Sequence, residues 1–223
     1  MQKETVSVKC AMCGTESEQE RIISKYTRDN EVYLDMRSST YIKSSLESVQ
    51  ECPNCHYCYY DISKKIVEFK WHENTEVKEI IDNKKLSDAA RKAMLMHFVL
   101  NFIGETQSAY TWAFVSAWCL DDCNLKKMAD EYRIEAGGLY QENIMNKQLS
   151  QMIQVSDLLR QLKDFDSAIE FAEKLQDLIS IGLENEDEDS SSHYMIKVLN
   201  GIIHFSKKGD SNPHLVSDIE NDK

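Results

Sequence analysis

The chain has 223 residues, 42% of them hydrophobic and 29% charged, which suits one large or two small globular domains. Only 7 glycines and 2 prolines are present, so long helices are expected rather than a loop-rich all-β fold. The formal charge is −12, and the part after residue 72 holds 27 acidic and 16 basic residues, which argues against nucleic-acid binding by that part.

The chain shows no signal for a membrane or for secretion. It contains no run of about 18 apolar residues, and no apolar core follows Met1, so neither a membrane span nor a secretory signal is expected. The 7 cysteines are an odd number, which disfavours a fully paired disulfide framework. We therefore expect free thiols in a reducing compartment, the cytoplasm.

The N-terminal part consists of short segments of β-strand character around two cysteine pairs. This pattern predicts a zinc-ribbon domain over residues 1–72. The expected strands are Thr5–Lys9, Glu31–Met36, Leu46–Gln50 and Tyr57–Ile62.

From about residue 75 the apolar residues follow a helical period, and Ser87 is a suitable N-cap for a helix to about Gly104. Asp164 is a suitable cap for a later helix. We predict a helical domain over residues 73–208, an acidic loop over 184–192 and a disordered tail over 209–223. The further helices expected are 108–120, 125–146, 148–162, 165–181 and 192–207.

Two of these helix pairs have a similar spacing, which indicates an internal repeat. Ala117 is followed by Ala129 in the next helix, and Ser156 is followed by Ala168 at the same distance. This is the spacing of a tetratricopeptide-type helical hairpin, although the two units lie 39 residues apart instead of the usual 34. The expected fold is therefore α+β: a small N-terminal zinc-ribbon β module followed by an all-α, tetratricopeptide-like helical-hairpin domain. An irregular helical bundle is the alternative.

The strongest motif is a pair of C-x₂-C turns, Cys10–Cys13 and Cys52–Cys55. Each turn brings two thiolates to one ion, and two turns supply the closed tetrahedral ligand set of a structural Zn²⁺ site. Gly14 supplies the left-handed backbone that closes the first turn. We therefore predict Cys10, Cys13, Cys52 and Cys55 as metal ligands, with the ion replacing a hydrophobic core that so small a module lacks.

Two neighbours of the second turn leave alternatives open. His56 stands where a glycine is usual, and it is either a residue that tolerates the left-handed region or, less simply, a ligand. Cys58 continues the spacing and is a spare thiol, an alternative ligand or part of an iron–sulfur site. The spare thiol is the preferred interpretation.

Other candidate residues have simpler structural explanations. Cys119 and Cys123 are expected to be packing residues rather than a second metal or redox pair, and His97 and His204 lie among apolar residues as packing groups. The aromatic residues Tyr110, Trp112, Phe114 and Trp118 are expected in the core, with a ligand groove as the alternative.

The segment between the two cysteine pairs carries an acid–base pair. Asp35 and Arg37 are expected to brace their loop, and the alternative is that Arg37 contacts an anionic ligand. No catalytic motif is recognised, so no enzyme activity and no catalytic residues are expected.

The order of the motifs resembles a bacterial family of uncharacterised proteins with a zinc ribbon before tetratricopeptide-like helices. The resemblance spans about residues 8–205 and is carried by Cys10-x₂-Cys13-Gly14, Asp35-Met36-Arg37-Ser38-Ser39, Val49-Gln50-Glu51-Cys52-Pro53-Asn54-Cys55-x-Tyr57, and the helical residues 117–122 with Arg133. It implies the same four metal ligands and a bacterial cytoplasmic origin, but no reaction. The family usually has glycine where this chain has His56.

Three functions are compatible with these patterns. We favour a non-catalytic adaptor that binds a protein or peptide on its helical surface. The first alternative is a zinc ribbon that associates with nucleic acid. The basic residues of the ribbon favour this function, whereas the glutamates interleaved with them disfavour it. The second is a thiol-based redox switch. The sequence does not indicate the partner or the oligomeric state.

Overall fold

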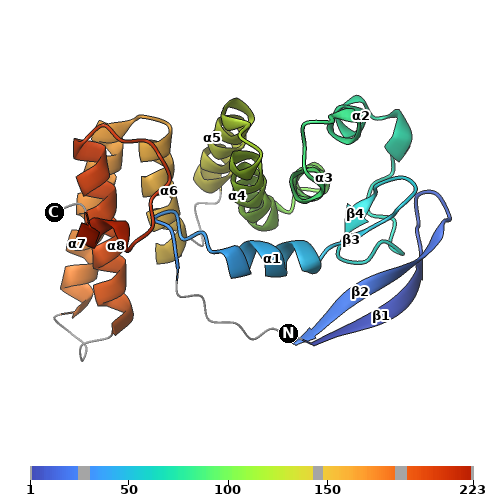
Figure 1. The fold of residues 1–223 in the computed structure, drawn as a ribbon, viewed down its shortest axis with the longest axis horizontal. Coiled ribbons are helices and arrows are strands. Elements are labelled where there is room, and N and C mark those ends of the chain that lie inside the picture. The colour runs from blue at the N-terminus through green and yellow to red at the C-terminus, as the bar shows by residue number, and fades with distance from the viewer. Residues whose placement is uncertain (1, 25–30, 143–147, 184–189, 222–223) are drawn as a thin grey trace. The chain divides into compact units, whose positions relative to one another are not determined.

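The computed structural model describes residues 2–24, 31–142, 148–183 and 190–221 (Figure 1). Their contacts divide the chain into two compact units. The first holds the described residues of 1–28 and 40–143, and the second holds those of 29–39 and 144–223. The domain boundary predicted after residue 72 does not coincide with this division into units, and it stays a prediction.

A small region of antiparallel strands begins the first unit. β1 (Gln2–Lys9) pairs with β2 (Glu16–Ser24), and Val6 faces Gln19 across the hairpin. A second, two-residue pair joins β3 (Gln50–Glu51) to β4 (Cys58–Tyr59). Helices follow these strands, so the α+β layout is confirmed.

Two helices of the first unit begin at polar residues whose side chains cap them. Asn74 caps α2 (Thr75–Asp82) by accepting a hydrogen bond from the Val77 amide, and Ser87 caps α3 (Asp88–Phe102) in the same way through Ala90. A short 3₁₀ helix, η1 (Trp71–Glu73), precedes them. Also in this unit are α1 (Ser39–Glu47), of which Ser39 belongs to the second unit, α4 (Thr106–Asp122) and α5 (Lys126–Glu142).

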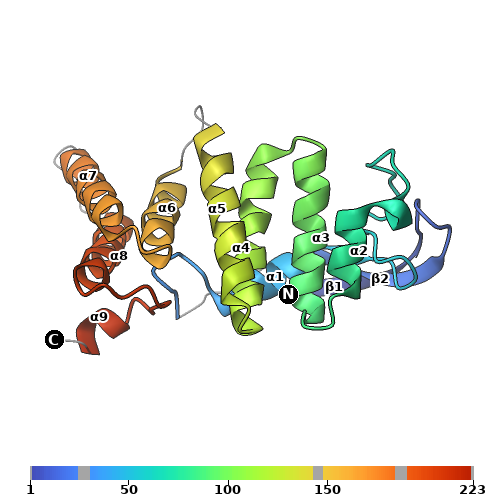
Figure 2. The same ribbon diagram turned by 90° about the horizontal axis from the view of Figure 1, so that it is seen from above.

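Helix α4 is the centre of the first unit. It packs against both α3 and α5, and Figure 2 shows these three helices side by side. The aromatic side chains expected in the core are there: Tyr110, Trp112, Phe114 and Trp118 are all buried. The segment after β4 contacts this helix as well, because Trp112 donates a hydrogen bond of 3.1 Å to the Tyr60 hydroxyl.

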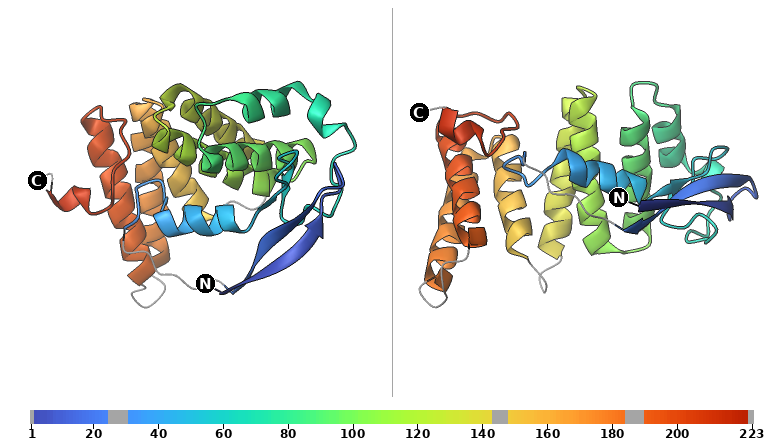
Figure 3. Two further views of the ribbon diagram at one scale, coloured as in Figure 1. Left: turned by 45° about the vertical axis from the view of Figure 1, so that its right-hand side comes forward. Right: turned by 60° about the horizontal axis from the view of Figure 1, so that its bottom comes forward.

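The second unit is built around α6 (Leu149–Gln161), α7 (Phe165–Leu183) and α8 (Ser190–Lys207), followed by the short α9 (Asp218–Asn221) (Figures 1 and 3). Leu34, far away in the sequence, is fully buried in their apolar core. Gly201 permits this, since a Cβ atom there would lie 2.7 Å from a Leu34 methyl group. The other buried members of the core are Ile153, Ala172, Leu175, Ile179, Val198, Leu199, Ile202, Phe205 and Val216.

The α4–α5 and α6–α7 connections have the same turn. Asn124 and Lys163, 39 residues apart, both adopt a left-handed backbone, with φ of 58° and 68°. The next residue in each turn donates its amide to a carbonyl five residues earlier, Leu125 to Leu120 and Asp164 to Leu159. The Ser156 hydroxyl then bonds to the carbonyl of Ala168, linking α6 to α7. Ser156 and Ala168 are two of the residues from which a repeat is predicted, and the repeat itself stays a prediction.

Several predicted segments differ from the structure. The segment Glu31–Met36 is not a strand, since it makes only an isolated bridge, Tyr33 to Leu215, and Met36 takes a left-handed φ of 62°. Most of the strand predicted at 46–50 is the end of α1 and the turn after it. Strand β2 was not predicted. Of the acidic loop 184–192, residues 190–192 are helical and the rest lies outside the described residues.

A disordered tail was predicted from residue 209, but the described residues 209–221 have defined contacts, and a buried charge cluster binds the start of this segment. Arg160 is fully buried, and its Nη1 donates to the carbonyls of Asp210 and Asn212 at 2.7 and 2.8 Å. Asp157 binds the same guanidinium through Nε at 2.7 Å. The His214 ring then stacks on Phe205, with 3.6 Å between the ring centroids.

Candidate metal centre

Two short turns with the same backbone bonds carry the cysteines. In the first, the Gly14 amide bonds to the Cys10 carbonyl at 2.9 Å, and in the second the His56 amide bonds to the Cys52 carbonyl at 2.9 Å. Gly14 and His56 both have a left-handed backbone, with φ of 76° and 56°. His56 therefore takes the conformation that its position predicts for a residue replacing glycine.

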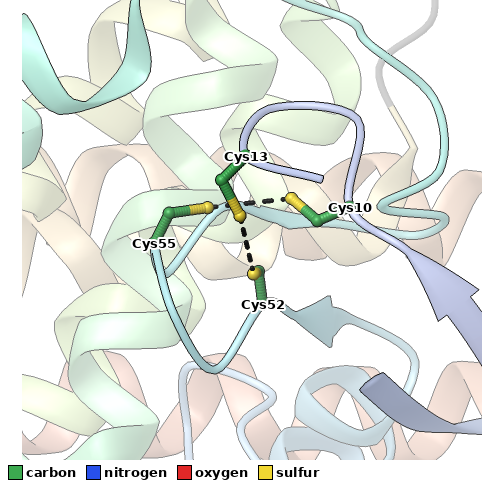
Figure 4. A group of neighbouring side chains, drawn as sticks. All are labelled: Cys10, Cys13, Cys52 and Cys55. Carbon is green, nitrogen blue, oxygen red and sulfur yellow. Dashed lines mark hydrogen bonds between the residues drawn. The ribbon is translucent and has the colours of Figure 1, made fainter. Parts of the chain in front are cut away.

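The four cysteines meet at one point (Figure 4). One ligand sulfur from each of Cys10, Cys13, Cys52 and Cys55 lies within 4.8 Å of the other three. The sulfurs of Cys13 and Cys52 are 3.5 Å apart, and those of Cys10 and Cys55 are 3.7 Å apart. A tetrahedral zinc ion with bonds of about 2.3 Å to sulfur separates its ligands by about 3.8 Å, so these spacings fit such an ion.

No second cluster of three or more metal-ligand side chains is found in the part of the chain that the structure describes. Cys58 is outside the group: it is fully buried, and its sulfur lies 3.4 Å from the carbonyl oxygen of His56. Burial raises the pKa of the Cys58 thiol well above its usual value. This environment is that of a neutral spare thiol, the preferred prediction.

The four thiols of the cluster have unequal surroundings. Cys10, Cys52 and Cys55 are buried, whereas Cys13 is half-buried. Burial raises the pKa of Cys10 and of Cys55. For Cys13, burial also acts upward, but hydrogen bonds with the Thr15 hydroxyl and amide, Asn54 and Cys52 together outweigh it and lower the pKa to about 6. Cys13 therefore ionises more easily than Cys10 or Cys55.

Aromatic residues support the second turn from behind. The Trp71 indole donates a hydrogen bond of 2.8 Å to the carbonyl oxygen of Cys55. Tyr57, which follows the turn, is fully buried and packs edge-on against Trp71 at 5.2 Å. These contacts fix the backbone that carries the Cys55 sulfur, as outer-shell partners do in metal sites.

A charged contact joins the same turn to helix α3. Glu51 accepts a hydrogen bond from His56 Nδ1 at 2.7 Å, and Arg91 Nη2 reaches the same carboxylate oxygen at 3.3 Å. The side chain of Gln19 on β2 bonds to the Glu51 backbone at 3.0 Å. Glu51 belongs to the motif directly before Cys52, but the sequence predicted no role for it. The sequence patterns did not single out Trp71, Arg91 or Gln19, because nothing in their spacing relates them to the cysteines.

The remaining candidate residues are not members of the cluster. Cys119 is buried inside α4, and the sulfur of Cys123 lies 3.3 Å from the Ser87 hydroxyl oxygen. Asp35 accepts a bond from the Arg37 backbone amide at 3.1 Å, while the Arg37 guanidinium lies over the Tyr33 ring at 4.0 Å. The expected loop brace is therefore present.

Two histidines expected to pack in apolar surroundings differ from one another. The buried His97 has polar contacts on both ring nitrogens, 2.9 Å to the Ala109 carbonyl and 3.0 Å to Glu135. His204 packs edge-on against Phe205, with 5.0 Å between the ring centroids. His97 therefore links three helices rather than simply filling space.

Comparison of the chain with known proteins identifies no significantly similar protein. No protein-family model, no curated protein and no solved structure matches the chain significantly. The family resemblance drawn from the motifs therefore stays a prediction. No helix within the described residues is long and apolar enough to cross a membrane. The fold and the site define an α+β protein with a four-cysteine cluster that can hold a metal ion.

Proposed function

We propose that this protein is a non-catalytic adaptor whose N-terminal region is held together by one structural Zn²⁺ ion. The observation that carries the metal assignment is the convergence of four cysteine sulfurs within 4.8 Å of one another. Thiolates favour Zn²⁺ over Mg²⁺ and Ca²⁺, and four of them fill its tetrahedral shell. A filled shell leaves no position for a substrate or an activated water, which supports a structural role.

The adaptor role is supported by the architecture beside the cluster. Helical hairpins in series commonly present extended surfaces to peptides and proteins. The same turn geometry at Asn124 and Lys163 supports such a series here. The zinc ion then keeps the cysteine turns folded against α3, through the contact of Glu51 with Arg91 and the ring contact of Trp71 with Phe98, and so keeps the helices of the first unit in place.

Metal analysis tests the first half of the proposal. The purified protein is expected to contain one zinc per chain, and Cys10→Ser or Cys52→Ser to lose most of it. Cys58→Ser and Cys119→Ser are the matched controls, because both are buried cysteines outside the cluster, and both should keep the metal. A metal-free wild-type protein that unfolds cooperatively would contradict the assignment.

Site-specific photo-crosslinking tests the second half. A photoreactive amino acid placed on exposed helical positions, one per variant, is expected to give crosslinks to a protein partner in cells that make the zinc-loaded protein. The Cys52→Ser background should weaken crosslinks from the first unit. Zinc-loaded protein that gives no crosslink from any exposed position would remove the adaptor role.

One observation favours a second candidate, a thiol redox switch. Cys13 is half-buried, and its sulfur is 3.5 Å from that of Cys52. Hydrogen peroxide would convert these two thiolates into a disulfide and two hydroxide ions, with release of the metal. Retention of zinc under mild peroxide, measured with a colorimetric chelator, would argue against the switch.

A further inference from the structure

Helix α7 has one face in the core of the second unit and an opposite face in solvent. Ala168, Ala172, Leu175 and Ile179 form the buried side. The opposite side, called here the α7 face, consists of Asp166, Glu170, Glu173, Asp177, Leu178 and Ile181. Asp166, Glu170, Glu173, Asp177 and Ile181 follow one another at steps of three or four residues and so lie along one exposed stripe. Leu178 lies beside this stripe, three residues before Ile181.

The first part of the α7 face is a row of carboxylates. Asp166, Glu170, Glu173 and Asp177 follow one another at steps of four, three and four residues, so they extend over about 16 Å of helix. Lys174 is the one basic residue of α7, and it pairs with Glu170. The other three carboxylates form no ion pair with a described residue. Three negative charges on this face are therefore available to a partner.

The second part of the α7 face is apolar. Leu178 is 62% exposed and Ile181 is 61% exposed, and a spacing of three residues places them side by side. A single exposed aliphatic side chain is ordinary, but an adjacent pair that continues a row of acids is the pattern of a surface that receives an amphipathic helix. Exposure of the pair leaves apolar surface that a partner would remove from water.

We propose that the α7 face binds a basic amphipathic helix of another protein. The inference rests on the adaptor role proposed above, and it names the chemistry of the partner. Lysine or arginine residues at steps of four, three and four would face the carboxylates, and two leucines beyond them would cover Leu178 and Ile181. The negative charge of the α7 face excludes other occupants. A second copy of the chain would place acidic residues against acidic residues, and the carboxylates repel nucleic acids and anionic membranes.

The test uses the full-length, zinc-loaded protein and a fluorescein-labelled synthetic helix with that arrangement of lysines and leucines. Fluorescence anisotropy should show binding that weakens about tenfold between 50 and 300 mM salt. The same peptide with glutamine in place of each lysine should bind at least tenfold more weakly. Equal binding of the two peptides would overturn the proposal.

Two variants on the α7 face test its parts. Glu173→Gln/Asp177→Asn should weaken binding of the lysine peptide at least fivefold, and so should Leu178→Ser/Ile181→Ser. Asp166 is left intact because an acidic residue in the first turn stabilises the helix itself. The control is Glu79→Gln/Glu131→Gln, which makes the same change in net charge at exposed positions of the first unit. If this control weakens binding as much, the attraction comes from overall charge and the proposal falls.

Crosslinking separates this inference from the adaptor role. Crosslinks to a partner from the exposed residue 174, which lies beside the α7 face, competed by the lysine peptide, support the inference. Crosslinks from residue 131 on α5 but not from residue 174 would refute it while leaving an adaptor role in place. Self-association that the Leu178→Ser/Ile181→Ser variant abolishes, measured by sedimentation, would assign the face to a second copy and also refute it.

Discussion

The indole Nε1 of Trp71 donates a hydrogen bond of 2.8 Å to the carbonyl oxygen of Cys55. Trp71 begins η1, the first helical turn after the ribbon, and its side chain is buried. One side chain of the helical part therefore holds the backbone of a proposed metal ligand. The consequence is that zinc binding and the packing around η1 should depend on each other.

Trp71→Phe tests this dependence. Phenylalanine keeps most of the apolar packing but loses the hydrogen bond, so zinc affinity should fall roughly tenfold, as for other outer-shell changes. Unfolding in urea should become easier by about 1–3 kcal/mol. Trp112→Phe is the matched control, because it loses an indole bond to Tyr60 away from the cluster. Equal loss of zinc affinity in both variants, measured by competition with a chelator, would disprove the link.

A pair of glycines gives predictions of opposite sign. Gly14 has a left-handed backbone and no close neighbour, so Gly14→Ala should destabilise by about 1–2 kcal/mol through backbone strain. Gly138 lies inside α5 with open space around it, so Gly138→Ala should stabilise by about 0.5–1 kcal/mol. Thermal unfolding of the zinc-loaded proteins measures both. Stabilisation by Gly14→Ala would contradict the described geometry of the first turn.

The environment of Glu135 leads us to expect that its contribution to the free energy of unfolding depends on pH. The hydrogen bond from His97 holds the pKa of the Glu135 carboxyl below its usual value. A carboxylate with a lowered folded pKa stabilises the fold above its unfolded pKa of about 4.3, and this stability is lost as the pH falls through the folded pKa. Glu135→Gln should therefore be less stable than wild type at pH 7, and the difference should shrink below pH 4.

The size of that difference is limited by solvent. The Glu135 side chain is 40% exposed, so the difference at pH 7 should stay below about 1 kcal/mol. Glu131→Gln, one turn earlier in α5 and exposed, is the control for the loss of one negative charge. Urea titrations at several pH values compare the three proteins. A gap for Glu135→Gln that widens as the pH falls would show that the sign is wrong.

Because Arg133 is buried, we expect a single substitution there to lower the free energy of unfolding strongly. Its side chain is 1% exposed and pairs with Asp121 and Asp130. Arg133→Met should destabilise by about 3–5 kcal/mol, because it leaves the carboxylate of Asp121 desolvated without a partner. Adding Asp121→Asn should restore part of the loss. Lys174→Met, which breaks an exposed pair, should cost less than about 0.5 kcal/mol, and similar losses in the two single variants would refute the assignment.

The sequence was most informative where a local rule decides the structure. The cap at Ser87 and the helix that follows it are set by neighbouring residues, and so is the left-handed His56. The cysteine pairs were recognisable because the spacing within each pair is itself the requirement of the metal. No local sequence pattern of this kind indicates which helical surface a partner would occupy.

The errors concern segments whose structure depends on distant residues. Strand β2 contains Glu16, Glu18 and Glu20, which are poor strand formers, and it exists because β1 pairs with it. The segment Glu31–Met36 alternates as a strand does, but Leu34 and Asp35 are both buried, which requires neighbours on two sides. Those neighbours come from α6, α8 and the segment near Leu215, more than 100 residues later.

The position of Leu34 in the chain limits how this protein can be cut into fragments. Residues 31–39 belong to the second unit, yet in the sequence they lie between the two cysteine pairs that meet in the first. A single cleavage near residue 143 would leave a C-terminal fragment with an unfilled place in its core, and an N-terminal fragment with an unsupported apolar loop. Expression of either half alone should therefore yield insoluble material, and a co-expressed pair should recover the fold.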